Sequence, residues 1–190
     1  METKEYALVV DAEKCKGCKK CEIACVEAHT SLTRKEIIKN KATNLSRIKV
    51  CKIEKAKVPV QCRQCHNAPC ARVCPTAALV REPGMVRVRQ QLCVGCKMCV
   101  MVCPFGAINV DHNEPIIGDA APSSRKVAIK CDQCSEWRAK NNEEQTACAK
   151  ACKFGAIKFV EIHEYQAQKA EEAARCCVDA CGAAEAQQIN

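Results

Sequence analysis

Aromatic side chains are scarce in this chain of 190 residues, because Phe, Tyr and Trp together make up only 3% of it. Aromatic rings dominate the energetics of ordinary cores, so a conventional aromatic-rich core is excluded. The chain also lacks a run of about 18 apolar residues, which a membrane-spanning helix needs, and Met1–Val10 lacks the apolar segment of a secretory signal. We therefore expect a cytoplasmic protein without a direct membrane span, either free or at the cytosolic face of a membrane complex.

Signatures of catalysis are missing as well. The sequence contains no phosphate-binding loop, no flavin or nicotinamide fingerprint, and no nucleophile with a base nearby. We therefore expect that the chain is not an enzyme by itself.

Cysteine, in contrast, is abundant, with 20 residues. The densest run, Cys93 to Pro104, has the spacing C-x2-C-x2-C-x3-C-P. In bacterial ferredoxins with this spacing, three thiolates bind one [4Fe–4S] cluster and the fourth binds the other cluster. Gly95 lets the backbone approach inorganic sulfide, and Pro104 ends the helix that carries Cys103 away. Because metal binding can supply folding energy, clusters are expected to replace much of the missing core.

The same unit occurs four times along the chain. The first quartet repeats the C-x2-C-x2-C-x3-C spacing, with Gly17 in the place of Gly95. The second quartet has four residues between its second and third cysteines, and the fourth has thirteen. The four quartets are Cys15, Cys18, Cys21 and Cys25; Cys62, Cys65, Cys70 and Cys74; Cys93, Cys96, Cys99 and Cys103; and Cys131, Cys134, Cys148 and Cys152.

Other interpretations of the cysteines and the charge are weaker. A disulfide scaffold is disfavoured by the missing secretory signal and the regular C-x2-C spacing. Zinc explains cysteine pairs but does not require the x2-x2 triplets or the x3-C-P tail. The formal charge of +8 is compatible with nucleic-acid binding, but four clusters of about −2 each would balance it. A zinc-stabilised basic nucleic-acid-binding module is the alternative of another class, and a redox sensor or maturation factor is a third.

Short strands and helices are predicted between the quartets. The strands fall at 6–10, within 45–60, at 78–81 and 85–89, at 105–110 after a turn, at 126–130 and at 158–162. Helices are predicted at 22–30 and 164–190. Residues 31–44 are interpreted as a polar surface insertion, and 111–124 as a loop. The histidines are interpreted as surface or turn residues; they are His29, His66, His112 and His163.

Four quartets in this order, the fourth with its widened gap, resemble the four-cluster [4Fe–4S] ferredoxin-like electron-transfer subunits. Such subunits serve molybdopterin oxidoreductases, formate dehydrogenases, hydrogenases and carbon monoxide dehydrogenases. The resemblance covers residues 6–163. The compact length is most similar to the CooF-type iron–sulfur subunit of nickel carbon monoxide dehydrogenase. The chain departs from the pattern in that no proline follows Cys25 or Cys152, which puts the local exit turns in doubt.

The resemblance implies an α+β fold with two interlocked bacterial 2[4Fe–4S] ferredoxin-like modules, short hairpins and helices. Residues 1–61 together with 112–163 would form the outer module, and 62–111 the central module. Residues 164–190 would form a helical, cysteine-containing tail.

The resemblance also implies four [4Fe–4S] clusters, with ligands exchanged between the two quartets of each module. The implied ligand sets are Cys15, Cys18, Cys21 and Cys152 for cluster 1; Cys131, Cys134, Cys148 and Cys25 for cluster 2; Cys62, Cys65, Cys70 and Cys103 for cluster 3; and Cys93, Cys96, Cys99 and Cys74 for cluster 4.

The function implied is a relay of single electrons through these clusters. The donor would be a catalytic oxidoreductase, with carbon monoxide dehydrogenase favoured, and the acceptor a hydrogenase or a flavin/NAD(P) oxidoreductase. The alternative is an electron-transfer subunit of a formate dehydrogenase or another molybdopterin oxidoreductase. No nucleic-acid partner is expected.

Four further cysteines lie outside the quartets, and four is the number that one more [4Fe–4S] cluster needs. Cys177 and Cys181 are four residues apart and would share one face of a helix. The sequence therefore predicts a fifth metal centre, with a zinc site, a disulfide or free thiols as the alternatives. Its residues would be Cys51, Cys176, Cys177 and Cys181.

Overall fold

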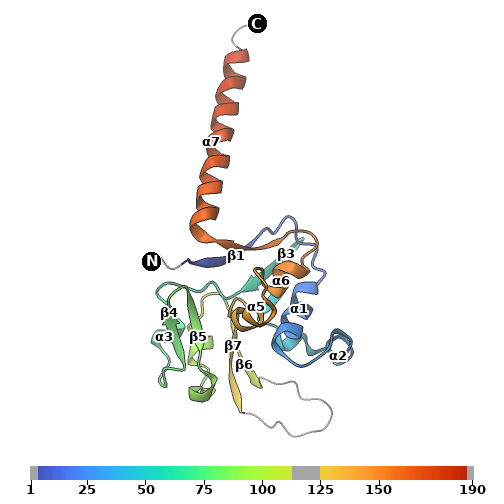
Figure 1. Ribbon diagram of the computed structural model, residues 1–190, viewed down its shortest axis with the longest axis vertical. Coiled ribbons are helices and arrows are strands. Elements are labelled where there is room, and N and C mark those ends of the chain that lie inside the picture. Colours follow the sequence, from blue (N-terminus) through green and yellow to red (C-terminus); the bar gives the residue numbers. More distant parts are fainter. Residues whose placement is uncertain (1–3, 113–124, 188–190) are drawn as a thin grey trace.

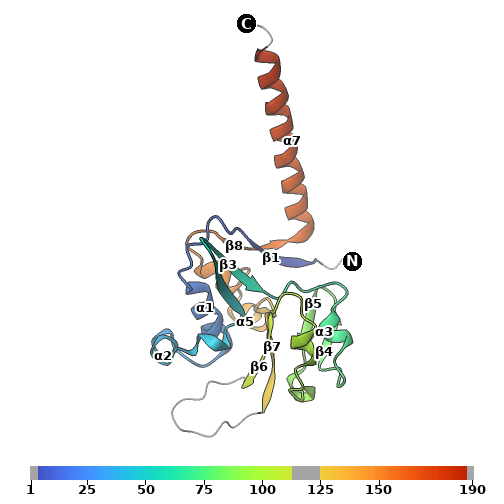
Figure 2. The ribbon, with the colours of Figure 1, turned by 180° about the vertical axis from the view of Figure 1, so that it is seen from behind.

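Two-stranded antiparallel sheets and short helices form the body of the molecule, and one long helix projects from it (Figures 1 and 2). This computed structural model describes residues 4–112 and 125–187, with side chains up to residue 178. The mixture of short hairpins and helices with a helical C-terminal tail confirms the predicted α+β fold class.

Each sheet contains two strands. β1 (Tyr6–Val10) pairs with β8 (Ile157–Glu161), β2 (Ile48–Ile53) with β3 (Ala56–Gln61), β4 (Leu79–Glu82) with β5 (Met85–Val88), and β6 (Ile108–His112) with β7 (Lys126–Lys130). The strands predicted within 45–60 and at 78–81 and 85–89 are confirmed, and each pair forms a hairpin. The strands predicted at both ends of the body are confirmed as well. Of the predicted loop at 111–124, Asp111 and His112 belong to β6, and 113–124 lie outside the described residues.

The helices lie between these strands in the chain. They are α1 (Lys20–His29), α2 (Arg34–Lys39), α3 (Pro69–Arg72), α4 (Met98–Met101), α5 (Ser135–Asn141), α6 (Ala147–Ala151) and α7 (Ile162–Gln187), with 3-10 turns η1 (Ala42–Leu45) and η2 (Gln90–Leu92). α1 packs against α6 and α3 packs against α4.

The first and last strands of the body form one sheet although they are far apart in the sequence. In the β1–β8 register, Leu8 lies opposite Phe159. The rings of Tyr6 and Phe159 stack with their centroids 5.1 Å apart, and Gln133 Nε2 donates to the Tyr6 carbonyl at 2.7 Å. These contacts bring the first and fourth cysteine quartets to the same part of the fold.

Small apolar cores take the place of one large core, as the scarcity of aromatic residues predicts. One core gathers residues of α3, α4 and β4–β7, including Ala78 and Val86. A second core gathers residues of β1, α1, β2 and β8, including Ile48 and Phe159. Quartet cysteines are members of both cores, so the cysteine sites and the apolar packing form together. The predicted boundary after residue 111 lies within β6, and the extents of the two modules remain a prediction.

The segment 31–44 is not merely a polar surface insertion. α2 begins with a capping box, in which Thr33 and Glu36 satisfy each other's backbone N–H groups. Ile37 is fully buried, and together with Leu32 and Leu45 it packs against Val26 in a third core. The sequence prediction was wrong here because only a few apolar residues, widely spaced among charged ones, supply this core.

α7 leaves the body directly after β8 and projects away from it (Figure 1). With 26 residues, the helix is about 39 Å long. In the part of the chain that the structure describes, no helix has the length and apolar character needed to cross a membrane.

Candidate metal centres

Each cysteine quartet contains a turn in which a non-glycine residue has left-handed backbone. Lys19, Ala68 and Lys97 occupy this turn in the first three quartets, two residues before the third cysteine. In the fourth quartet, with its widened gap, Cys134 itself is left-handed and α5 follows it. Left-handed non-glycine residues are uncommon and persist where the surrounding structure holds them. The repeat seen in the sequence is therefore a repeat of backbone conformation.

One small cavity is lined by three thiols of the first quartet and one of the fourth. Its cysteines are Cys15, Cys18, Cys21 and Cys152. The remaining walls are largely apolar and include Val50, Pro59 and Ile157. The β1–β8 sheet accounts for this grouping, because it returns the end of the fourth quartet to the loop that follows β1.

Two further cavities have the same design in the part of the fold built by the second and third quartets. Both have mainly apolar walls, with Phe105 and Ile108 in one and Leu79 and Val110 in the other. Each contains three thiols of one quartet and the last thiol of the other. The first is lined by Cys62, Cys65, Cys70 and Cys103, and the second by Cys93, Cys96, Cys99 and Cys74.

The remaining four quartet cysteines are packed together between α1 and α6. Cys25, Cys131 and Cys148 belong to one buried core, and Cys134 is also buried. Burial raises the pKa of Cys148 to about 12, and the nearby thiols of Cys25 and Cys134 contribute to this shift. Twelve quartet cysteines thus line three shared cavities, and the other four lie near one another without a common cavity. Their role as ligands is part of the function proposed below.

Backbone amides donate to several of these sulfur atoms. Such N–H···S hydrogen bonds stabilise negative charge on sulfur and are a means by which proteins adjust iron–sulfur reduction potentials. The donor and acceptor pairs are Arg47 N to Cys25 Sγ at 3.3 Å, Ala128 N to Cys93 Sγ at 3.3 Å, Ala107 N to Cys103 Sγ at 3.4 Å, and Gln133 N to Cys131 Sγ at 3.4 Å.

Several of the buried thiols are poor acids, whereas His29 and the Arg47 N–H lower the pKa of Cys25 despite its burial. Burial, with the Glu22 carboxylate and nearby thiols, raises the pKa of Cys21 to about 12, and burial with neighbouring thiols raises that of Cys99 to about 11. Thiolate, not thiol, is the metal ligand, and a bound metal deprotonates a coordinating thiol outright. Four such thiols around one apolar cavity form a donor set suited to a metal cluster.

His29 is not a surface histidine, and here the sequence interpretation was wrong. Its Nε2 lies 3.0 Å from Asp132 Oδ1, and its Nδ1 lies 3.8 Å from Cys25 Sγ. Arg47 Nη1 binds the other carboxylate oxygen of Asp132 at 2.6 Å. Burial works against charge on both groups, but the His29–Asp132 pairing raises the pKa of His29 to about 12 and, with Arg47, holds the pKa of Asp132 well below its ordinary value.

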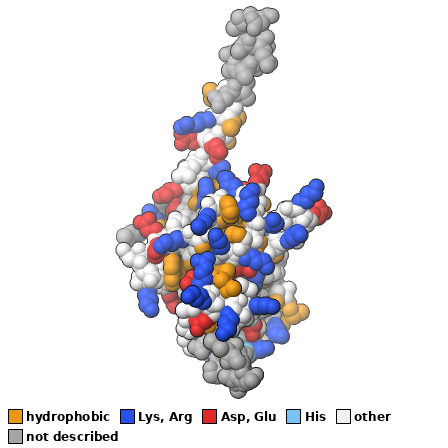
Figure 3. All heavy atoms as spheres, turned by 90° about the vertical axis from the view of Figure 1, so that its right-hand side faces the viewer, with side chains coloured by type: hydrophobic (Ala, Val, Ile, Leu, Met, Phe, Trp, Pro, Cys, Tyr) orange, Lys and Arg blue, Asp and Glu red, His pale blue; other side chains and the backbone are white. Residues whose placement is uncertain are grey.

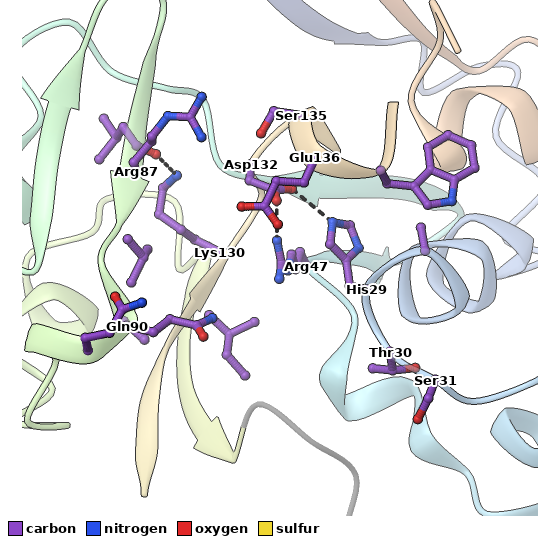
Figure 4. Close-up of a pocket in the computed structure, with 17 residues that line it drawn as sticks. His29, Thr30, Ser31, Arg47, Arg87, Gln90, Lys130, Asp132, Ser135 and Glu136 are labelled. Atoms are coloured by element: carbon purple, nitrogen blue, oxygen red, sulfur yellow. Dashed lines mark hydrogen bonds and ion pairs between the residues drawn. The ribbon is translucent and has the colours of Figure 1, made fainter. Parts of the chain in front are cut away.

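This His29–Arg47–Asp132 network lines a cleft of about 550 Å³ that also contains Lys130 and Glu136 (Figure 4). Sequence reasoning missed the network because its members come from α1, the segment before β2, and the fourth quartet. Two local signals were available: His29 lies one helical turn after Cys25, and Asp132 directly follows Cys131.

Of the four cysteines outside the quartets, the three whose side chains are described do not line these cavities. Cys51 is exposed on β2, and Cys176 and Cys177 are exposed on α7. Cys176 lies about 20 Å along the axis from the start of α7, which leads away from the body (Figure 1). The side chain of Cys181 is outside the described residues. The fifth centre remains a prediction.

The donor sets fit [4Fe–4S] clusters. Thiols from two quartets converge on each site, the walls are largely apolar, and peptide N–H groups point at the sulfur atoms. Such clusters are held by four cysteine thiolates and carry one electron at a time. An α+β chain of short hairpins with sites of this kind is an iron–sulfur protein of the ferredoxin type.

The chain belongs to the 4Fe-4S dicluster domain family, whose sequence model matches residues 53–162. It is 40% identical over 176 residues to a protein of Rhodospirillum rubrum named "Iron-sulfur protein", covering 90% of this chain and 91% of the relative. It is 37% identical over 178 residues to the electron transport protein HydN of Escherichia coli K12, covering 88% of this chain and 95% of HydN. It is 32% identical over 177 residues to formate hydrogenlyase subunit 2 of the same organism, covering 81% of each chain.

These relationships confirm the predicted family and its cofactors. The chain is an iron–sulfur electron-transfer protein, its cofactors are [4Fe–4S] clusters, and its four cysteine quartets agree with a count of four.

Proposed function

We propose that this chain relays single electrons along one row of four clusters, held in the order 1, 2, 3, 4 by the ligand sets named above. The observation that carries the proposal is that consecutive thiol sets are neighbours in space. The relay makes or breaks no bond on the chain itself. Its residues hold the clusters, adjust their potentials and keep water away from them.

The first two sets meet where α1 packs against α6. The thiol of Cys21, in set 1, lies close enough to Cys148, in set 2, to contribute to its raised pKa. Cys21 and Cys25 also lie one turn apart on α1, so a single helix supplies both sets. These contacts support a pair of outer clusters that lie side by side.

The second and third sets are joined by hydrogen bonds. Gln64, between two cysteines of set 3, donates from Nε2 to the carbonyl of Cys131 in set 2 at 2.8 Å. Its Oε1 accepts from Val86 N at 2.9 Å. The buried Lys130 donates to the same Cys131 carbonyl at 2.8 Å. The outer and central parts of the fold are therefore linked at this point, and an electron would cross between them here.

The third and fourth sets share the core around α3 and α4. Cys70 of set 3 and Cys99 of set 4 are both buried there, and the thiol of Cys70 contributes to the raised pKa of Cys99. Of the sixteen quartet cysteines, only Cys18 in set 1 and Cys96 in set 4 are exposed. The two ends of the row thus have the most exposed thiols, whereas the thiols of the middle sets are buried or half-buried.

In the proposed sets, the last cysteine of the second quartet binds the cluster of the third quartet, and the reverse. This exchange is tested by Cys103→Ser, with Cys74→Ser as its matched partner. Cys103→Ser should perturb the cluster of Cys62, Cys65 and Cys70, whereas Cys74→Ser should perturb that of Cys93, Cys96 and Cys99. Serine ligation changes the electron paramagnetic resonance (EPR) spectrum of the reduced cluster. If each substitution instead perturbed the cluster of its own quartet, the proposed sets would be wrong.

For the donor we favour carbon monoxide dehydrogenase, and for the acceptor a hydrogenase or a flavin/NAD(P) oxidoreductase. The compact, four-quartet sequence supports this choice. The alternative is a formate dehydrogenase or another molybdopterin oxidoreductase, and the relationship to a formate hydrogenlyase subunit favours that alternative.

Anaerobic mixing distinguishes the two donors. The oxidised protein is mixed with carbon monoxide dehydrogenase and carbon monoxide, or with formate dehydrogenase and formate, and its visible absorbance is followed. Bleaching at catalytic rates with the first pair alone supports our choice. Bleaching with the second pair alone supports the alternative, and bleaching with neither would refute both donors.

A further inference from the structure

Lysine residues are concentrated at one end of the proposed row of clusters. Residues 14–20 include four lysines, and residues 52–57 include three. Three of these side chains line the cavity that contains the exposed Cys18. We define the lysine surface as Lys16, Lys19, Lys20, Lys52, Lys55 and Lys57.

The tertiary structure brings the two groups of lysines together. A Cβ on Gly17, between Cys15 and Cys18, would lie 2.5 Å from Lys57 Cδ, so the Lys57 side chain passes directly over the first-quartet loop. The β2–β3 hairpin therefore lies against this loop. Lys and Arg side chains are dense on the face at the right-hand side of Figure 1, where the loop between β1 and α1 runs (Figure 3).

The lysine surface is not arranged for stability. Lys52 lies directly opposite Lys57 in the β2–β3 register, and like charges in that position destabilise a hairpin. Within the described residues, the lysines found in ion pairs are Lys14, Lys150 and Lys169, none of which belongs to the surface. Unpaired positive charge at this position requires another explanation.

Balancing the charge of the clusters does not explain it either. Four clusters of the same kind carry the same charge, yet the positive residues are distributed unevenly among the quartets. Between its first and third cysteines, the third quartet has only Lys97 and the second only Arg63, while the C-x2-C pair of the fourth encloses Asp132 and no lysine. Among the quartet loops, the first has the most lysines, and the hairpin that covers it adds three more.

The opposite end of the row has a different surface. The cavity of the exposed Cys96 has a single cation, Lys97, and its other exposed side chains are apolar, with Val94 60% and Met98 41% exposed. The positive charge is therefore a property of the Cys18 end and not of every exposed quartet.

We propose that the lysine surface is a docking site for an acidic redox protein, which exchanges electrons with the chain through the thiol set that includes Cys18. This inference rests on the proposed function and adds the chemistry of one partner to it. Complementary charge steers encounter and raises association rates by about 10- to 1,000-fold at low salt. Such docking is reversible and weakens as salt screens the charges.

Two small oxidants, one anionic and one cationic, test whether the lysine surface creates a local positive electrostatic potential. The reduced protein, freed of reductant, is oxidised in a stopped-flow instrument by tris(oxalato)cobaltate(III), an anion, and by hexaamminecobalt(III), a cation. The test variant is K52E/K55E/K57E, which leaves the cysteine loop intact. The matched control is K35E/K39E/K41E, which makes the same change in net charge on α2 and the turn before η1. Iron content and the EPR spectrum of each reduced variant establish that its clusters are intact.

The test variant should lose about tenfold or more of the rate with the anionic oxidant at low salt, while the control variant loses much less. An equal loss in both variants would show that only net charge matters and would overturn the proposal. If the clusters of all variants remain reducible, the proposed relay function stands whatever the outcome. Should K52E/K55E/K57E not retain its clusters, K16E/K20E provides the same comparison from the other side of the surface.

Docking itself is tested with a plant-type [2Fe–2S] ferredoxin as the acidic probe protein. A carbodiimide joins lysines to carboxylates that are in direct contact, and mass spectrometry identifies the joined residues. Cross-links concentrated on the lysine surface, and lost at high salt, support the proposal. Cross-links spread evenly over the lysines of the chain would overturn it. Preferential binding of a short DNA duplex, abolished by K52E/K55E/K57E, would also overturn it in favour of a nucleic-acid partner.

Discussion

Replacement of Gly95 by alanine tests how closely β7 is held against the third cysteine quartet. Gly95 has φ +70°, and a Cβ at this position would lie 2.7 Å from the backbone oxygen of Lys126. An ordinary contact begins near 3.4 Å, so β7 would have to move by about 0.7 Å. The next strand residues include Ala128, whose N–H donates to Cys93 Sγ at 3.3 Å. A shift of β7 therefore reaches a proposed cluster ligand.

Gly106→Ala is the matched control, because it separates the cost of left-handed backbone from the cost of the forced contact with Lys126. Gly106 also has positive φ, +56°, but a Cβ there would meet nothing within 4 Å. The left-handed backbone alone costs about 1–2 kcal/mol with alanine, and this cost applies to both variants. The forced contact adds about 1–3 kcal/mol for Gly95→Ala only. Each 1.36 kcal/mol is tenfold in rate. If the strain is released before the rate-limiting step, Gly95→Ala should therefore lose its clusters about 5- to 160-fold faster than Gly106→Ala.

The assay is the rate at which visible absorbance disappears in guanidinium chloride with an iron chelator, under anaerobic conditions. A rate suits this protein better than an equilibrium free energy of unfolding, because cluster loss is irreversible. Equal rates for Gly95→Ala and Gly106→Ala would refute the inferred contact between the third-quartet loop and β7. The rate of cluster loss in a Gly17→Ala variant should lie between those of Gly95→Ala and Gly106→Ala. The atom that a Cβ at position 17 would meet belongs to the flexible side chain of Lys57, which can move aside.

Three further predictions follow from other parts of the molecule. His29→Gln removes a positive neighbour of Cys25 and should lower the reduction potential of the cluster proposed there, as measured by an EPR-monitored redox titration. His66→Gln, at an exposed histidine, is the control. Equal potentials in wild type and His29→Gln would show that His29 does not adjust the potential of this cluster. The fifth centre predicts that a triple serine variant of Cys176, Cys177 and Cys181 loses about four irons per chain, whereas an iron content near sixteen in both proteins would reject it. Removal of the clusters should abolish cooperative thermal unfolding followed by circular dichroism, because metal binding supplies folding energy where apolar cores are small; a native-like transition without iron would disprove this.

Much of this protein could be predicted from local sequence. The C-x2-C-x2-C spacing, the turn-forming glycines and the strands between quartets depend on contacts among residues that are close together along the chain. The α+β class, the [4Fe–4S] cofactors and the helical tail were therefore predicted correctly. The prediction for residues 31–44 was wrong because Ile37 of α2 is buried in a core that also contains Ile129 of β7, a residue far away in the sequence.

The sequence by itself determined how many thiol quartets the chain carries and which chemistry they suit, because ligand spacing within a loop is set by a few backbone dihedral angles. The resemblance implied which quartets exchange a thiol, but only the tertiary structure decided which thiols reach the surface and which charges surround them. His29 and Asp132 are 103 residues apart, and Lys57 reaches the Gly17 loop only because the β2–β3 hairpin folds over it. Such contacts depend on how sheets and helices pack, and packing depends on the whole chain at once.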